Sequence, residues 1–141
     1  MIQKILLPTD GSEYAEKTIR YALNLAKALG ANIEVMYAFQ PSTSLRKRAA
    51  MMMEEYRKAL EEDAQEIVTE VAERFRSEGL TVSATVVEGP AAEAILRAID
   101  ELKPSLVVMG ARGGGGFTNV LLGGVAEQVI HHSPVPVLVV K

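Results

Sequence analysis

Short apolar segments alternate with helical segments along the whole chain, and this alternation constrains the fold more than any other feature. The expected strands are 2–7, 33–39, 80–87, 105–109 and 135–140. Strands that alternate with helices form a parallel sheet with right-handed crossovers and helices on both faces. The sequence therefore predicts an α/β fold in which a parallel sheet lies between two helical layers.

The four helical segments carry recognisable start and stop signals. Ser12 is the expected N-cap of the first helix, which Gly30 ends. The second helix is the longest and runs to about Glu78; Pro90 suits the first position of the third helix, and the fourth covers about 123–132. The expected buried stripe of the long helix consists of Tyr56, Leu60, Ile67, Val71 and Phe75.

Length and composition set the class of protein. The chain has 141 residues, which predicts one domain over 1–141, and 48% of them are hydrophobic, enough for a sizeable core. A net charge of −3 argues against nucleic-acid binding, and the absence of cysteine excludes disulfides and thiolate metal sites. No segment has the length of a signal peptide or a membrane span, so we expect a soluble, cytoplasmic protein without a membrane partner.

A glycine-rich segment, 110–116, follows the fourth expected strand. Glycine lets backbone N–H groups approach a phosphate without a side chain in the way. The helix that begins near Gly123 would add N–H donors and a partial positive charge, and Arg112 would add a permanent cation. These features are typical of an anion-binding site. The same residues are also compatible with a flexible turn and a solvent-exposed arginine that bind nothing.

A second polar turn, Pro8-Thr9-Asp10-Gly11-Ser12, follows the first strand. In open α/β sheets ligands bind beyond the carboxyl ends of the strands, where both of these turns are expected to lie. Asp10 is either a ligand for a ribose or a phosphate-bound metal, or a residue of the turn alone. The chain has no Walker A sequence, and its glycines follow the wrong strand for a dinucleotide fingerprint.

The glycine segment and its flanks resemble the nucleotide-binding motif of the universal stress protein family. That motif has three glycines, with two residues between the first and the second and nine residues between the second and the third. Gly110, Gly113 and Gly123 have this spacing. The opening 4–12 and the ending 134–140 are also similar to the family, as is Glu88-Gly89-Pro90. The likeness covers essentially the whole chain.

The resemblance implies a single-domain, three-layer Rossmann-like sandwich, with five parallel strands in the order 3-2-1-4-5. It also implies a homodimer and, in one branch of the family, bound ATP, with ADP and AMP as alternatives and Mg²⁺ held mainly by the phosphates. The implied contacts at the adenine and ribose are Pro8, Thr9, Asp10 and Ala38, with Met109 beside the base. Those implied at the phosphates are Gly110, Arg112, Gly113, Gly123, Gly124, Val125 and Ala126.

One residue departs from the family pattern. The pattern has Ser or Thr after the third glycine, and this chain has Gly124. A hydrogen bond to a charged phosphate contributes about 1.5–3 kcal/mol, so losing the hydroxyl would weaken binding about 10–150-fold. Thr118 is a possible substitute, although nothing in the sequence positions it.

The last strand, Val135–Val140, is expected at an edge of the sheet and is apolar. An unprotected edge invites pairing with another chain, so we expect a two-fold dimer through this strand.

Three functions remain open at this point. The first is a regulatory protein in which an adenine nucleotide orders the glycine segment and 42–53 and so changes the surface shown to a protein partner. The second is a dimeric stress or interaction protein that does not depend on nucleotide. The third is a slow ATPase, for which Asp10 is the obvious carboxylate and a dedicated second group is missing.

Overall fold

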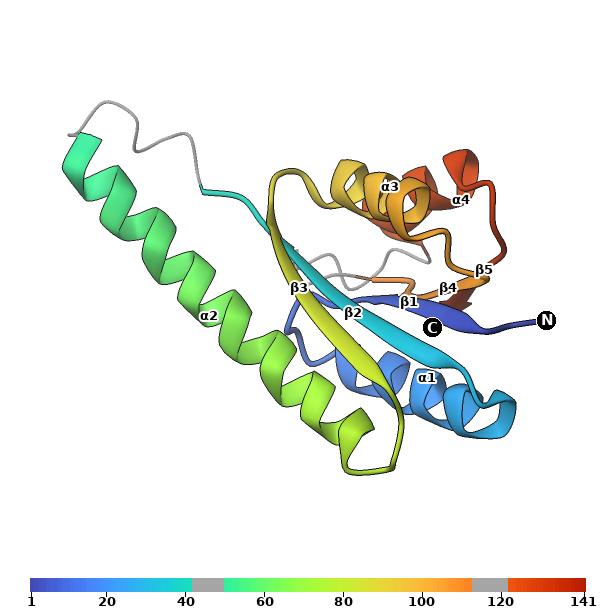
Figure 1. Ribbon diagram of the computed structural model, residues 1–141. Helices are drawn as coiled ribbons and strands as arrows, with labels where there is room; N and C mark the ends of the chain where they lie inside the picture. Colours follow the sequence, from blue (N-terminus) through green and yellow to red (C-terminus); the bar gives the residue numbers. More distant parts are fainter. Residues whose placement is uncertain (42–49, 113–121) are drawn as a thin grey trace.

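The structure is a computed structural model that describes residues 1–41, 50–112 and 122–141. Figure 1 shows a twisted sheet with helices on both faces. The elements in chain order are β1 (Lys4–Pro8), α1 (Ala15–Leu29), β2 (Asn32–Phe39), α2 (Ala50–Arg76), β3 (Val82–Glu88), α3 (Ala91–Leu102), β4 (Leu106–Gly110), α4 (Gly124–His132) and β5 (Val137–Val140). In these stretches of chain no helix is long and apolar enough to cross a membrane.

The five strands are all parallel and lie in the order β3-β2-β1-β4-β5. This confirms the predicted α/β class and strand order. β1 is central and pairs with β2 on one side and β4 on the other. The chain therefore leaves β1 and β4 in opposite directions along the sheet, which opens a crevice above their carboxyl ends.

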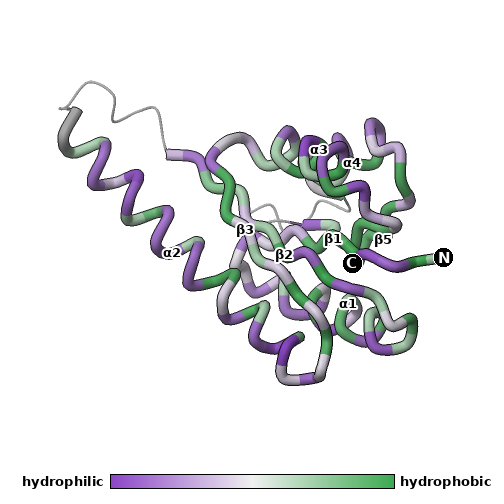
Figure 2. The backbone as a smooth tube through the Cα atoms, in the orientation of Figure 1, coloured by the Kyte–Doolittle hydropathy of each residue, from purple (hydrophilic) through white to green (hydrophobic). Residues whose placement is uncertain are grey.

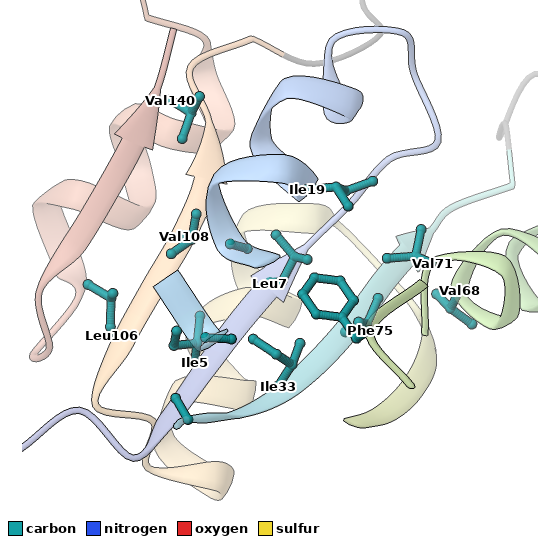
Figure 3. Packing of buried hydrophobic residues seen from close by; sticks show 14 residues of the cluster. Ile5, Leu7, Ile19, Ile33, Val68, Val71, Phe75, Leu106, Val108 and Val140 are labelled. Carbon is teal, nitrogen blue, oxygen red and sulfur yellow. The ribbon is translucent and has the colours of Figure 1, made fainter. Parts of the chain in front are cut away.

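Alternate residues of the central strands build two separate cores. Ile5 and Leu7 of β1 face α1 and α2, where they pack with Phe75 (Figure 3). Leu6 faces the opposite side and belongs to the cluster beneath α3 and α4. Because all three β1 side chains are fully buried, the strand reads as a continuous apolar run, as a strand covered on both faces should.

The long helix α2 is buried mainly along its C-terminal half. Val71 and Phe75 are buried as predicted, whereas Tyr56, Leu60 and Ile67 are only half-buried. Figure 1 shows the N-terminal end of α2 leading away from the sheet, so it has less surface to pack against. Figure 2 shows the corresponding alternation of hydrophilic and hydrophobic residues along this helix.

Two predicted helix starts were wrong by one or two residues. Ser12 is not the N-cap of α1, which begins at Ala15 after Tyr14 and has no side-chain cap. The Ser12 N–H instead donates to Oδ1 of Asp10 at 2.9 Å, because an Asp side chain readily closes a turn onto the backbone two residues later. Pro90 is the N-cap residue of α3 and not its first helical residue.

Candidate functional site

A cavity of about 310 Å³ lies at the carboxyl ends of β1 and β4, between the start of α1 and the start of α4. Its volume is at the lower end of the range for small-molecule sites. The expected contact residues that the structure describes all line it: Pro8, Thr9, Asp10, Ala38, Met109, Gly110, Arg112, Gly123, Gly124, Val125 and Ala126. Gly113, Thr118 and most of 42–53 lie outside the described residues.

One end of the cavity is apolar. Met36 and Ala38 come from β2, Met109 from β4 and Ile95 from α3, and all four line this end with the tip of β1. Met36, Met109 and Ile95 are buried, so their side chains are held by the core beneath. Such a surface suits a flat, weakly polar group such as an aromatic base.

The turn after β1 is held by hydrogen bonds that its backbone N–H groups donate. The Thr9 N–H donates to the Met36 carbonyl at 2.8 Å, and this bond continues the pairing of β1 with β2 past the end of the strand. The Gly11 N–H lies 3.4 Å from Thr9 Oγ1, and one oxygen of Asp10 accepts from Ser12. The Asp10 carboxylate is thereby fixed at the rim of the cavity.

The other end of the cavity is the N-terminus of α4. The Gly123 N–H donates to the Ala111 carbonyl at 2.6 Å, which holds the start of α4 beside the end of β4. The first helical bond runs from the Glu127 N–H to the Gly123 carbonyl. The N–H groups of Gly124, Val125 and Ala126 therefore have no acceptor within the helix, and they carry the positive end of its dipole.

Charged and aromatic groups surround this end. The charged side chains among the described lining residues are Asp10 and Arg112. The Arg112 guanidinium lies 5.9 Å from the centre of the Tyr14 ring, within cation–π range.

Sequence reasoning missed the wall that α1 contributes. Ala15, Thr18 and Ile19 line the cavity, and Ala91 joins them from α3. These residues belong to apolar helix faces, so their pattern predicted only core packing. Thr18 carried a usable signal, since it is a polar residue at a buried position of the apolar stripe of α1.

The whole sequence, residues 1–141, matches the Universal stress protein family. The chain belongs to this family. It is 33% identical over 141 residues to universal stress protein MJ0531 of Methanocaldococcus jannaschii, covering all of this chain and 83% of that protein. It is 32% identical to a universal stress protein of Thermus aquaticus, with both chains fully covered.

Two solved structures illustrate how closely the fold is shared. Protein MJ0577 of Methanocaldococcus jannaschii is 28% identical and superposes with a TM-score of 0.89, over 100% of this chain and 96% of the other. A universal stress protein crystallised in complex with cAMP is 27% identical, with a TM-score of 0.73 over 99% of this chain and 97% of the other.

Proposed function

We propose that this universal stress protein is a regulatory protein that binds an adenine nucleotide, with ATP as the principal ligand and ADP or AMP as alternatives. The observation that carries the proposal is one cavity with two unlike ends. An apolar surface lies at one end, and helix N–H groups with Arg112 lie at the other. This pairing matches a nucleotide, which joins a flat base to an anion, and the relative solved with cAMP supports it.

In the proposed complex the base lies against Ala38 and Met109, and the Asp10 carboxylate accepts hydrogen bonds from ribose hydroxyls. The phosphates lie toward Arg112 and the first turn of α4, where backbone N–H groups donate to them. Among the described residues no three His, Cys, Asp or Glu side chains form a metal-binding group. A Mg²⁺ ion that accompanies ATP would therefore take most of its ligands from the phosphates and water.

The proposed switch is a change of exposed surface. Arg112 and Gly123 line the cavity and come just before and shortly after 113–121 in the sequence, and Ala38 comes shortly before 42–49. A bound nucleotide would therefore contact residues that are close in sequence to both segments. A protein partner that reads this surface would then distinguish the bound from the free form.

The test is the nucleotide content of the purified protein, released by heat and separated by ion exchange, followed by titration calorimetry with ATP, ADP, AMP and adenosine. Stoichiometric nucleotide or saturable binding is expected, with GTP as the control for the base. Absence of bound nucleotide together with absence of any thermal shift at millimolar Mg-ATP would overturn the proposal and leave a nucleotide-independent role.

The same proposal includes a homodimer through Val135–Val140. The strand β5 pairs with β4 on one side, and Leu138 is 37% exposed on this short apolar strand. Pairing with a second copy would satisfy its outer backbone groups and cover the apolar side chains. Light scattering should give twice the monomer mass, and Leu138→Glu should halve it, whereas Leu29→Glu at another exposed leucine should not. A monomeric wild type at micromolar concentration would refute the dimer.

A further inference from the structure

Thr18 is buried in the wall of the cavity and has an unpartnered hydroxyl. Its side chain lies on α1, the residue is 2% exposed, and Oγ1 makes no hydrogen bond with any described residue. A helical threonine commonly donates to the carbonyl four residues earlier, and Thr18 does not use this acceptor. Native proteins leave few buried polar atoms unpaired, so this hydroxyl needs an explanation.

The position of Gly110 locates the hydroxyl within the site. A Cβ atom on Gly110 would lie 3.2 Å from Thr18 Oγ1 and 3.3 Å from the Arg112 carbonyl oxygen. Thr18 Oγ1 therefore lies beside the end of β4, where the glycine segment begins. A side chain at 110 would crowd the hydroxyl, and glycine leaves room beside it.

Energetics argue against a purely structural role. Valine has nearly the same shape as threonine and would fill the same space without burying an unpaired hydroxyl. We therefore expect the free protein to be less stable with threonine at this position than with valine. Unsatisfied groups of this kind concentrate at sites where a partner arrives later.

We propose that the Thr18 hydroxyl donates a hydrogen bond to the phosphate nearest the sugar of the bound nucleotide. This inference rests on the proposed function. Asp10, Thr18 and Arg112 all line the cavity, and Thr18 Oγ1 lies beside Gly110, two residues before Arg112. In the proposed complex the ribose lies at Asp10 and the phosphates lie toward Arg112. Thr9 and Thr18 are the hydroxyl side chains among the described lining residues; Thr9 Oγ1 has the Gly11 N–H as a partner at 3.4 Å, whereas Thr18 Oγ1 has none.

The hydroxyl can reach a ligand by a small movement. Threonine in a helix has two favoured χ1 positions, and rotation between them moves Oγ1 to a new position while another substituent of Cβ takes its place. Rotation lets the hydroxyl leave its place beside Gly110 when a phosphate oxygen enters the cavity. Thr18 would then supply a side-chain donor at a site where Gly124 has none.

The experiment compares Thr18→Val with Thr18→Ser by calorimetry and thermal unfolding. For Thr18→Val we expect a higher Tm without ligand and about 10-fold weaker binding of AMP, ADP and ATP alike. Adenosine should bind Thr18→Val and wild type equally, because it has no phosphate. Thr18→Ser keeps the hydroxyl and should retain the wild-type preference for AMP over adenosine.

Three results would overturn the inference. Equal affinity of Thr18→Val and wild type for AMP would show that the hydroxyl makes no contact with phosphate, while leaving the proposed function intact. A lower Tm for the unliganded Thr18→Val protein would show that the hydroxyl has a partner within the chain. Failure of the wild type to bind any of the four ligands would overturn the proposed function itself, and this inference with it.

Discussion

A Cβ atom on Gly11 would lie 2.7 Å from Cδ1 of Ile67, so the turn after β1 and the helix α2 are in direct contact. The turn carries Asp10 and forms one edge of the cavity, while Ile67 lies in the middle of α2. The position of α2 therefore bears directly on the position of the Asp10 carboxylate. Gly11 also has φ of +71°, a conformation that a residue with a side chain rarely adopts.

We predict that Gly11→Ala destabilises the protein more than Gly30→Ala. Both glycines have similar positive φ values, +71° and +65°, so both substitutions cost about 1–2 kcal/mol of backbone strain. Gly30 has no atom within 4 Å of its Cβ position, so it is a control for strain alone. The contact with Ile67 adds about 0.5–1.5 kcal/mol at Gly11, because the isoleucine must leave its rotamer. Urea unfolding measures both.

A second variant isolates the contact. Ile67→Val removes Cδ1 and with it the close contact. In the Ile67→Val background, Gly11→Ala should therefore cost only the backbone strain, which is about as much as Gly30→Ala costs in the wild type. Equal destabilisation by Gly11→Ala and Gly30→Ala would show that the turn and α2 do not touch in solution.

The fold follows from local sequence because each central strand is a short apolar run between clear turns. Ile5, Leu6 and Leu7 have no polar neighbour that would favour one face, and this predicts a strand buried on both sides. Periodicity alone does not order the strands, since any right-handed crossover could place β2 on either side of β1. That order came from the resemblance of the glycine motif to the family.

The lining of the cavity was predictable where it consists of turn residues at strand ends, as with Asp10 and Gly110. It was not predictable where helices supply the wall, because Thr18 and Ile19 lie at buried positions of α1 and their spacing indicates core packing. The sequence also did not show which of two neighbouring polar side chains would accept a hydrogen bond from the turn. Asp10 and Ser12 are both good capping residues, and only the folded turn decides that the Asp10 side chain accepts the Ser12 N–H.

We predict that Gly124→Ser strengthens the binding of phosphate-bearing ligands. A Cβ atom at this position meets nothing within 4 Å, so serine fits at the first residue of α4. Its hydroxyl would restore the donor that the family motif has there, with a gain of about 10-fold in affinity for ATP. Gly124→Ala is the matched control, because it adds the same Cβ without the hydroxyl. An equal gain for alanine would assign the effect to helix stability instead.

We predict that Tyr14 helps to orient Arg112 through its ring. The guanidinium lies 5.9 Å from the ring centre, and such contacts contribute about 0.5–1 kcal/mol at exposed sites. Tyr14→Leu should therefore weaken ATP binding about 2–5-fold, whereas Tyr14→Phe should leave it unchanged. Calorimetry at low salt checks both. Equal loss in the two variants would mean that the phenol oxygen matters and the ring does not.

Finally, we predict that an ion pair between α1 and α2 stabilises the protein only above acidic pH. Arg74 donates two hydrogen bonds to Glu16, at 2.7 and 2.8 Å, and these lower the pKa of Glu16 below its ordinary value of 4.5. Since the folded pKa is the lower one, this stabilisation is complete above about pH 4.5 and is lost as the pH falls through the folded pKa. Both side chains are substantially exposed, so the contribution is below about 1 kcal/mol.

The measurement is urea unfolding of the wild type and Arg74→Met at about pH 6 and about pH 3. The variant should be less stable at the higher pH, and the difference should shrink or vanish at the lower one. Arg76→Met is the control, because the ion pair of Arg76 with Glu73 lies within α2 and does not link α2 to α1. If Arg74→Met is destabilised equally at both pH values, its effect comes from packing of the arginine stem, and the charge pair contributes nothing.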